Sequence, residues 1–176
     1  STRTNTANAP TNFTYTAATN QTLTATWVYG AANYFILEVS TSQSDFANPT
    51  SSITVNTSGT VGLISPLSVN TTYYGHVAAV VSGSTSAFST PAVATATLAN
   101  QPVSVASTWT YVGITSVTAT WAPNGNPSGT RYDIQLSTSN SFNGSLDKFN
   151  VAITTDTAFT GLVPNTVYYA QVRAVN

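Results

Sequence analysis

The chain has 176 residues, enough for one large or two small domains, and only 5% of them are charged. Its four Lys and Arg residues are scattered and do not form the basic patch that nucleic-acid binding requires, and no apolar run is long enough to span a membrane as a helix. The sequence has no cysteine and one histidine, so it favours no disulfide framework and no cysteine-based metal centre.

The first half of the chain contains three stretches in which apolar and polar residues alternate: residues 22–27, 34–42 and 70–81. This period of two predicts half-buried antiparallel strands, in which Leu23, Ala25 and Trp27 share one face. A further candidate strand, Thr90–Asn100, follows a loop of small polar residues.

The second half of the chain repeats these stretches in the same order, at a spacing of about 95 residues. Residues 116–121, 131–139 and 165–175 match the three strands of the first copy. Val117, Ala119 and Trp121 again share one face, and no 11-residue window has helical periodicity. Two domain-sized all-β units of short strands, each with a Trp early in the unit, are therefore predicted to be β-sandwiches.

The end of each unit carries a motif that resembles the fibronectin type III domain. The second copy has the full pattern: Leu162, Pro164, Thr166, Tyr168, Val172 and Ala174. The first copy has Leu67 and Tyr73, with Val69 in place of the proline. The resemblance implies two tandem fibronectin type III-like (immunoglobulin-like) β-sandwiches. It also implies a structural core of Trp27, Trp121, Tyr73, Tyr168, Leu67 and Leu162, in which both tyrosines bond to backbone just upstream.

The two copies differ in their last strand. A domain of this family has seven strands, and the second copy supplies six. At the other end of the chain, Ser1–Ala7 aligns with the candidate seventh strand of the first copy through a shared Ala-Asn-x-Pro. We therefore expect a strand-like segment at 1–8 that serves a neighbouring domain, a first domain at 9–99, and a six-stranded second domain at 100–176.

Three interpretations of this offset remain open at the level of sequence. The chain is one repeat of a longer tandem array, or copies exchange strands, or the seventh strand simply lies outside these residues. Strand exchange predicts assembly contacts at Ser1, Thr2, Arg3, Thr4, Asn5, Thr6, Val172 and Ala174.

No catalytic or cofactor-binding motif is present. His76 lies out of phase with the core and is expected to be a solvated surface residue, and no Ser-His-Asp set or calcium-loop spacing can be assembled. We therefore expect no enzymatic activity, no cofactor and no metal site.

Glycans are the other candidate partner. Asn-x-Ser/Thr sequons start at Asn12, Asn20, Asn56, Asn70 and Asn143, and the aromatic residues Tyr74, Tyr169, Trp109 and Tyr111 are candidates for stacking on sugars.

These observations together predict an extracellular or cell-surface structural protein whose partners are copies of itself, as a homopolymer or tandem array. Its units would form a filament or fibre, head to tail, by β-strand completion or tandem-domain stacking. The alternative is a carbohydrate-binding or spacer module pair of a larger secreted enzyme or adhesin.

Overall fold

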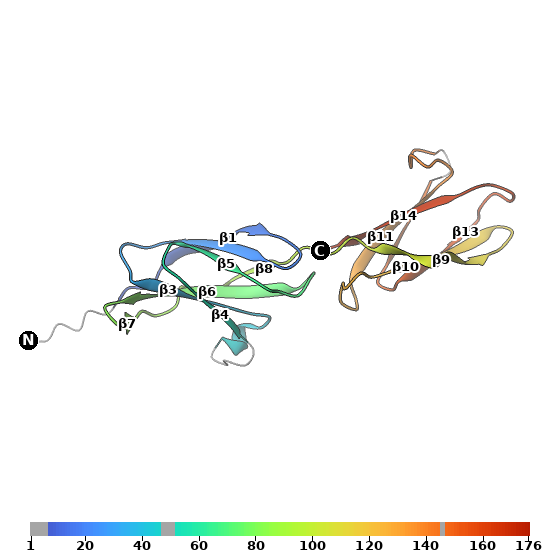
Figure 1. Ribbon diagram of the computed structural model, residues 1–176. Coiled ribbons are helices and arrows are strands. Elements are labelled where there is room, and N and C mark those ends of the chain that lie inside the picture. The colour runs from blue at the N-terminus through green and yellow to red at the C-terminus, as the bar shows by residue number, and fades with distance from the viewer. Residues whose placement is uncertain (1–6, 47–51, 145–146) are drawn as a thin grey trace, which may run out of the picture. The chain divides into compact units, whose positions relative to one another are not determined.

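The computed structural model describes residues 7–46, 52–144 and 147–176, which form two compact all-β units (Figure 1). The division between the units falls between Leu98 and Ala99. The described residues contain one short 3₁₀ helix, Gln43–Asp45, and otherwise only strands and their connections.

Unit 1 consists of two antiparallel sheets packed face to face. The first sheet has the order β1 (Thr11–Ala18), β2 (Leu23–Val28), β5 (Val61–Ile64). In the second sheet, β3 (Tyr34–Ser40) lies between β4 (Ser52–Thr57) and β6 (Thr72–Val81), and the outer edge of β6 pairs with β7 (Ser84–Thr85) and β8 (Val93–Ala96). Along β2 and β3, every second residue points into the space between the sheets and is buried, as the alternation in the sequence predicts.

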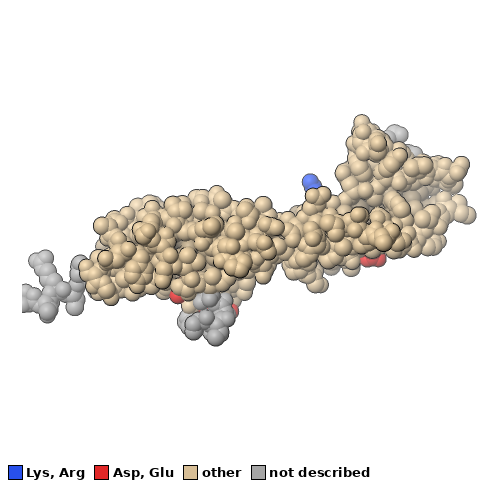
Figure 2. Space-filling model, viewed as in Figure 1, with Lys and Arg blue, Asp and Glu red and all other residues tan. Residues whose placement is uncertain are grey.

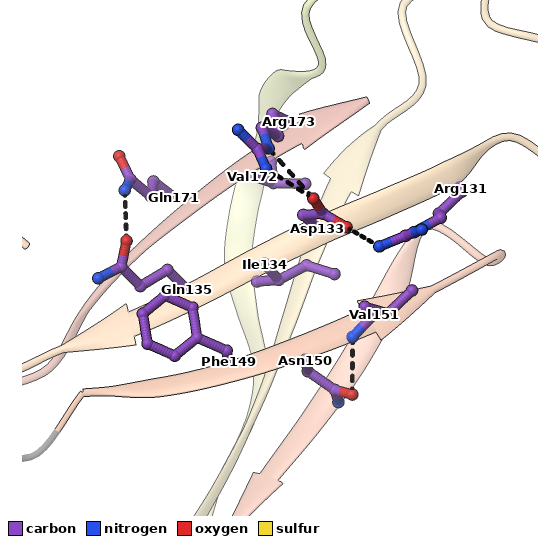
Figure 3. A pocket seen from close by; sticks show the side chains of 10 residues that line it. All are labelled: Arg131, Asp133, Ile134, Gln135, Phe149, Asn150, Val151, Gln171, Val172 and Arg173. Atoms are coloured by element: carbon purple, nitrogen blue, oxygen red, sulfur yellow. Dashed lines mark hydrogen bonds and ion pairs between the residues drawn. The ribbon is translucent and has the colours of Figure 1, made fainter. Parts of the chain in front are cut away.

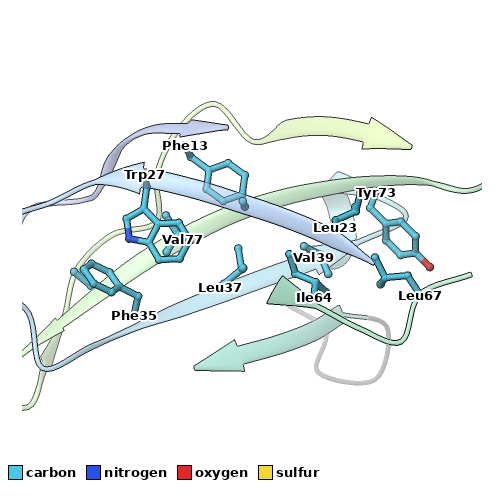
Figure 4. Packing of buried hydrophobic residues seen from close by; sticks show 12 residues of the cluster. Phe13, Leu23, Trp27, Phe35, Leu37, Val39, Ile64, Leu67, Tyr73 and Val77 are labelled. Carbon is cyan, nitrogen blue, oxygen red and sulfur yellow. The ribbon is translucent and has the colours of Figure 1, made fainter. Parts of the chain in front are cut away.

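The core of unit 1 lies between these sheets (Figure 4). Trp27 from β2 is 4% exposed and packs edge-on against Phe35 from β3, with ring centroids 5.3 Å apart. Leu23, Leu37 and Ile64 are fully buried. Large aliphatic and aromatic side chains from both sheets thus form the apolar layer that stabilises the sandwich.

Unit 2 has the same arrangement with fewer strands. One sheet has the order β13 (Asp156–Thr160), β10 (Ser116–Ala122), β9 (Val103–Val112). The other has the order β12 (Lys148–Ala152), β11 (Arg131–Ser137), β14 (Tyr169–Val175). The six described strands confirm the predicted all-β fold, and none of the described residues forms a seventh strand beside β14. Its core contains Trp121, Tyr132, Ile134, Leu136, Phe159 and Leu162.

A tyrosine hydroxyl fixes the turn before the sixth strand in each unit. Tyr73 Oη accepts a hydrogen bond of 3.0 Å from the Ser68 amide, and Tyr168 Oη accepts one of 3.1 Å from the Val163 amide. Both bonds join residues five positions apart, as the family resemblance implies. Tyr73 is 6% exposed, whereas Tyr168 is half-buried, which is the first sign that unit 2 is less covered at this end.

The units differ in how the first strand meets the sixth. In unit 1, Tyr15 on β1 lies over Gly75 on β6, where an added methyl group would collide with the Tyr15 hydroxyl. In unit 2, Trp109 pairs with Ala119 as Tyr15 pairs with Ala25, and Ala170 replaces Gly75. In unit 1 the large side chain of Tyr15 thus fits because residue 75 is a glycine.

Charged side chains are sparse on the face of the molecule that Figure 2 shows, in keeping with a charged fraction of 5% in the sequence. Within the described part of the chain, no helix is both long enough and apolar enough to cross a membrane.

Candidate functional site: the outer edge of β14

The seventh-strand position of unit 1 shows what completes a sandwich of this type. Tyr73 and Gly75 of β6 pair with Thr95 and Val93 of β8. Further along β6, Val77 and Ala79 bond to the connecting segment before β8. The Val77 amide donates to Ser89 Oγ at 3.1 Å, and the Ala79 amide donates to Ser86 Oγ at 2.9 Å. Val77 and Ala79 are consequently 0% exposed.

Thr97, just after β8, fastens the end of this strand to the rest of unit 1. Its hydroxyl donates a hydrogen bond of 2.6 Å to the Ser68 carbonyl and accepts one of 3.0 Å from the Thr71 amide. The Thr97 amide donates to the Thr71 carbonyl at 3.0 Å, and the Leu98 amide donates to the Thr19 carbonyl at 2.8 Å. The strand is therefore held by side-chain and backbone bonds as well as by sheet pairing.

The corresponding edge in unit 2 has no strand along it among the described residues. β14 pairs with β11 alone, from Tyr169 opposite Ser137 to Val175 opposite Arg131. Val172 and Ala174, which correspond to Val77 and Ala79, are half-buried instead of fully buried. An open row of backbone groups beside a partly exposed apolar face is a template for pairing with another strand.

A hollow of about 280 Å³ lies at the end of this edge. Its lining includes Gly113, Val163 and Thr166. Equivalent turn bonds place Gly113 at the position of Thr19, because Thr19 bonds to Thr22 as Gly113 bonds to Ser116. The matching place in unit 1 is filled by Thr97 and Leu98. The hollow therefore continues the open edge of β14 and has the position of a strand end.

The predicted assembly residues fall into two groups. Val172 and Ala174 lie on the open edge of β14. The other six, Ser1, Thr2, Arg3, Thr4, Asn5 and Thr6, lie outside the described residues. Of the predicted core residues, Trp27, Trp121, Leu67 and Leu162 are 4 to 6% exposed.

The expectation for His76 is wrong. His76 lies on the outward face of β6, but its ring is stacked between Phe46 and Phe88, with centroid distances of 3.9 Å to each. Its Nε2 atom lies 3.0 Å from Glu38 Oε2, and its side chain is only 12% exposed. Two loop aromatics cover the histidine, and a period of two cannot reveal contacts made by loops.

The four candidate sugar-stacking aromatics differ in exposure. Tyr111 is 58% exposed and Tyr169 is 42% exposed. Tyr74 is half-buried, and so is Trp109, which packs against the core of unit 2. Trp109 is thus not a free stacking surface. It occupies the same position on β9 as Tyr15 does on β1, and both side chains point toward the core.

The five sequon asparagines also lie in different surroundings. Asn12, Asn20, Asn56 and Asn143 are exposed. Asn70 is half-buried, and its amide donates a hydrogen bond of 3.2 Å to the Leu98 carbonyl. Attachment of a glycan requires an accessible asparagine side chain. The first four asparagines meet this requirement better than Asn70 does.

One charged cluster was missed by the sequence analysis. On the outer face of β11 and β14, Asp133 accepts hydrogen bonds from Arg173 at 2.9 Å and from Arg131 at 3.0 Å. The Arg173 hydrogen bond, together with the hydrogen bond and charge of Arg131, holds the pKa of Asp133 below its ordinary value. The spacing of Arg131 and Asp133 by two residues was the signal that they share a face. No group of three His, Cys, Asp or Glu residues within the described ranges has a metal-binding arrangement.

The fold and this edge define a pair of immunoglobulin-like β-sandwiches. Residues 102–176, which include all the strands of unit 2, match the family model for the fibronectin type III domain. A comparison with curated proteins found no match.

Solved structures extend the likeness to both units. The chain is similar to a two-domain fibronectin type III segment of chicken tenascin, with 18% identity and a TM-score of 0.61 over 95% of this chain and 91% of that one. It is also similar to the FN1–FN3 domains of chicken CNTN1, with 19% identity and a TM-score of 0.42 over 99% of this chain and 65% of that one. The tenascin likeness shows the tandem fibronectin type III fold. Domains of this fold are generally non-catalytic and typical of extracellular adhesion and structural proteins.

Proposed function

We propose that this protein is an extracellular structural protein, the repeating subunit of a filament or surface fibre joined head to tail through the outer edge of β14. The observation that carries this proposal is the contrast between two equivalent strands. β6 has partners on both edges, whereas β14 pairs with β11 alone among the described strands. Completing β14 would bury Val172 and Ala174 as Val77 and Ala79 are buried in unit 1.

Unit 1 defines what the completing strand has to provide. It needs backbone groups for the residues equivalent to Tyr73 and Gly75, which are Tyr168 and Ala170. Beyond its end, it needs a side chain with both a donor and an acceptor, in the position of Thr97. That side chain would donate to the Val163 carbonyl and accept from the Thr166 amide.

The first residues of a second copy meet these requirements. In the alignment of Ser1–Ala7 with Val93–Ala99, Asn5 takes the position of Thr97. An Asn side chain has a carbonyl acceptor and an amide donor, so it can make both bonds. Because such a contact joins the head of one chain to the tail of the next, it does not close on itself and propagates into a filament.

In the alternative form of the proposal, tandem-domain stacking, the strand that completes β14 comes from the same chain. In that form of the proposal, a later segment of a longer parent chain pairs with β14. The net charge of −1 and the charged fraction of 5% favour close packing of units in either form, because few like charges repel.

Disulfide formation between two variants tests whether the strand that completes β14 comes from a second copy of the chain. The chain has no native cysteine, so two variants with one cysteine each can be mixed. In unit 1, Thr72 lies opposite Ala96, and the equivalent pair is Val167 of one copy and Thr4 of the next. A mixture of Thr4→Cys and Val167→Cys is expected to form a disulfide-linked dimer on mild oxidation.

The matched control mixes Thr4→Cys with Ser128→Cys, because Ser128 is exposed in the turn before β11, which leads to the end of β14 opposite to Val167. Equal dimer yield from both mixtures would overturn strand exchange between copies. If strand exchange drives assembly, deleting Ser1–Ala7 is expected to abolish the increase of light scattering with protein concentration. Electron microscopy of the native material tests tandem stacking, which requires a fibre with a regular axial repeat.

The alternative function is a carbohydrate-binding or spacer module pair of a larger secreted protein. Exposed Tyr111 and Tyr169 favour it, because flat amphipathic rings on a polar β surface suit sugar contacts. Loss of binding to a polysaccharide panel on Tyr169→Ala, in a chain that stays monomeric, would support this alternative over the filament.

A further inference from the structure

The outer face of the sheet β12–β11–β14 in unit 2 is hollowed, with a volume of about 470 Å³. Its lining includes six polar or aromatic side chains on which the argument rests: Arg131, Asp133, Gln135, Phe149, Gln171 and Arg173 (Figure 3). They come from three neighbouring strands and face the same way, because their positions along each strand differ by two. This volume lies within the range of small-molecule and sugar sites.

The charged half of the hollow carries a net positive charge. Asp133 accepts hydrogen bonds from Arg131 Nη2 and from Arg173 Nε and Nη2. The side chains of Arg131 and Arg173 are 56% and 79% exposed, so both guanidinium groups also present N–H donors to solvent. Two guanidinium groups on one carboxylate leave one positive charge unbalanced, in a chain with only nine charged side chains, four Lys and Arg plus five Asp and Glu.

The other half of the hollow combines an aromatic ring with amides. Phe149, on the edge strand β12, is 75% exposed and lies directly opposite Gln135 in the sheet. Gln171 Nε2 donates a hydrogen bond of 2.7 Å to Gln135 Oε1, and Gln135 Nε2 donates to Asp147 Oδ2 at 2.8 Å. The amides are thus held in place beside an open ring face (Figure 3).

Unit 1 provides an internal comparison, because the same face there is closed by its own side chains. His76 occupies the position of Gln171, and Phe46 and Phe88 stack on both sides of it. Ile36 and Ala78 occupy the positions of Asp133 and Arg173. The open, positively charged face is therefore a property of unit 2 and not a general consequence of the fold.

We propose that this face of unit 2 binds an acidic polysaccharide through its uronate residues, with Arg131 and Arg173 on the carboxylate and Phe149 under the sugar ring. Guanidinium groups pair with carboxylates through two parallel N–H donors. The negative face of an aromatic ring attracts the C–H groups of a pyranose, and the Gln135–Gln171 pair offers hydrogen-bond partners for hydroxyl groups. A carboxylate ligand also balances the unpaired positive charge. This site uses outward-facing side chains of β11, β12 and β14, whereas the proposed assembly uses the backbone groups along the outer edge of β14, so the site does not depend on the assembly.

Binding of oligogalacturonate to the full chain, measured by calorimetry at low and at physiological ionic strength, tests the proposal. Arg173→Gln and Arg131→Gln are each expected to weaken binding about tenfold. The matched control is Lys148→Gln, which removes one positive charge from β12 at a side chain that lies beside Gly161 and outside the hollow. Its affinity should stay within about twofold of the original.

Two further variants give opposite signs. Asp133→Asn is expected to strengthen uronate binding, because it removes the carboxylate that competes for both guanidinium groups. Phe149→Ala is expected to weaken binding about tenfold without lowering the melting temperature, because the ring is mostly exposed.

Four outcomes would overturn the proposal. The first is no detectable binding of oligogalacturonate at low ionic strength. The second is equal weakening by Lys148→Gln and Arg173→Gln, which would show non-specific charge attraction. The third is equal affinity for poly-glutamate together with no effect of Phe149→Ala, which would identify an acidic peptide as the ligand. A neutral glucan that binds as tightly as the uronate would contradict the role of the two arginines.

Discussion

The hydroxyl of Thr97 lies 2.6 Å from the carbonyl oxygen of Ser68, and this contact joins the end of the seventh strand of unit 1 to the turn before the sixth. Thr97 is 0% exposed, and the same hydroxyl accepts a hydrogen bond from the Thr71 amide. One buried hydroxyl therefore satisfies two backbone groups of the turn before the sixth strand.

Replacing Thr97 with valine is expected to destabilise unit 1 by about 1–3 kcal/mol, because the shape is kept while the Ser68 carbonyl and the Thr71 amide lose their bonds to a buried hydroxyl. Urea unfolding followed through the amide resonances of unit 1 measures the change. Thr54→Val is the control, since Thr54 is exposed on β4 and should shift the midpoint by less than about 0.5 kcal/mol. Equal effects of the two substitutions would contradict the role of Thr97.

Substituting Gly75 with alanine is expected to cost about 1–3 kcal/mol, because the new methyl group collides with the Tyr15 hydroxyl. Tyr15→Phe removes that hydroxyl, which is buried and has no hydrogen-bond partner among the described residues. The double variant should therefore recover part of the lost stability, because the new methyl group would still lie 3.1 Å from Phe13 Cζ. A double-mutant cycle of unfolding free energies measures this. Additive effects would show that the two residues do not interact.

Alkaline pH is expected to destabilise unit 1 through Tyr15. Burial raises the pKa of the Tyr15 phenol above its ordinary value of 10.0. The folded chain then holds a proton that the unfolded chain releases, so the contribution of Tyr15 to stability is fully present below pH 10 and falls as the pH rises above it. The urea midpoint of unit 1 measured from pH 8 upward should show this decline, and Tyr15→Phe should reduce its slope. A slope identical in the two proteins would count against the assignment.

Phe88→Ala is expected to release the His76 ring from one side of its aromatic stack. Stacked ring pairs contribute about 0.5–1.5 kcal/mol beyond the area they bury, so a loss of that size is expected for unit 1. The ring protons of His76 should have upfield chemical shifts in the original chain, because aromatic rings lie 3.9 Å away on both sides. The shifts should move toward those of a free imidazole in the variant. Unchanged shifts would mean that the stack is not populated in solution.

Alternation of apolar residues was sufficient to predict the all-β fold. Residues within a strand alternate between the two faces of the sheet, and the sequence repeat shows the same alternation twice for the matched strands. Contacts made by loops left no comparable signal: the stack of Phe46 and Phe88 on His76 depends on where two connections return over the sheet. The Arg131–Asp133–Arg173 cluster was half visible, since Arg131 and Asp133 share one strand face, but the partner on β14 depends on sheet register.

The fit of Tyr15 over Gly75 has a consequence for tandem arrays of such units. Neighbouring domains of similar sequence risk exchanging strands during folding. If β1 replaced β9 in unit 2, the Tyr15 ring would meet the methyl group of Ala170 where its own domain provides only hydrogen. If β9 replaced β1, the larger Trp109 would enter a space shaped for a phenol. These poorer fits would disfavour exchange of first strands between the two units.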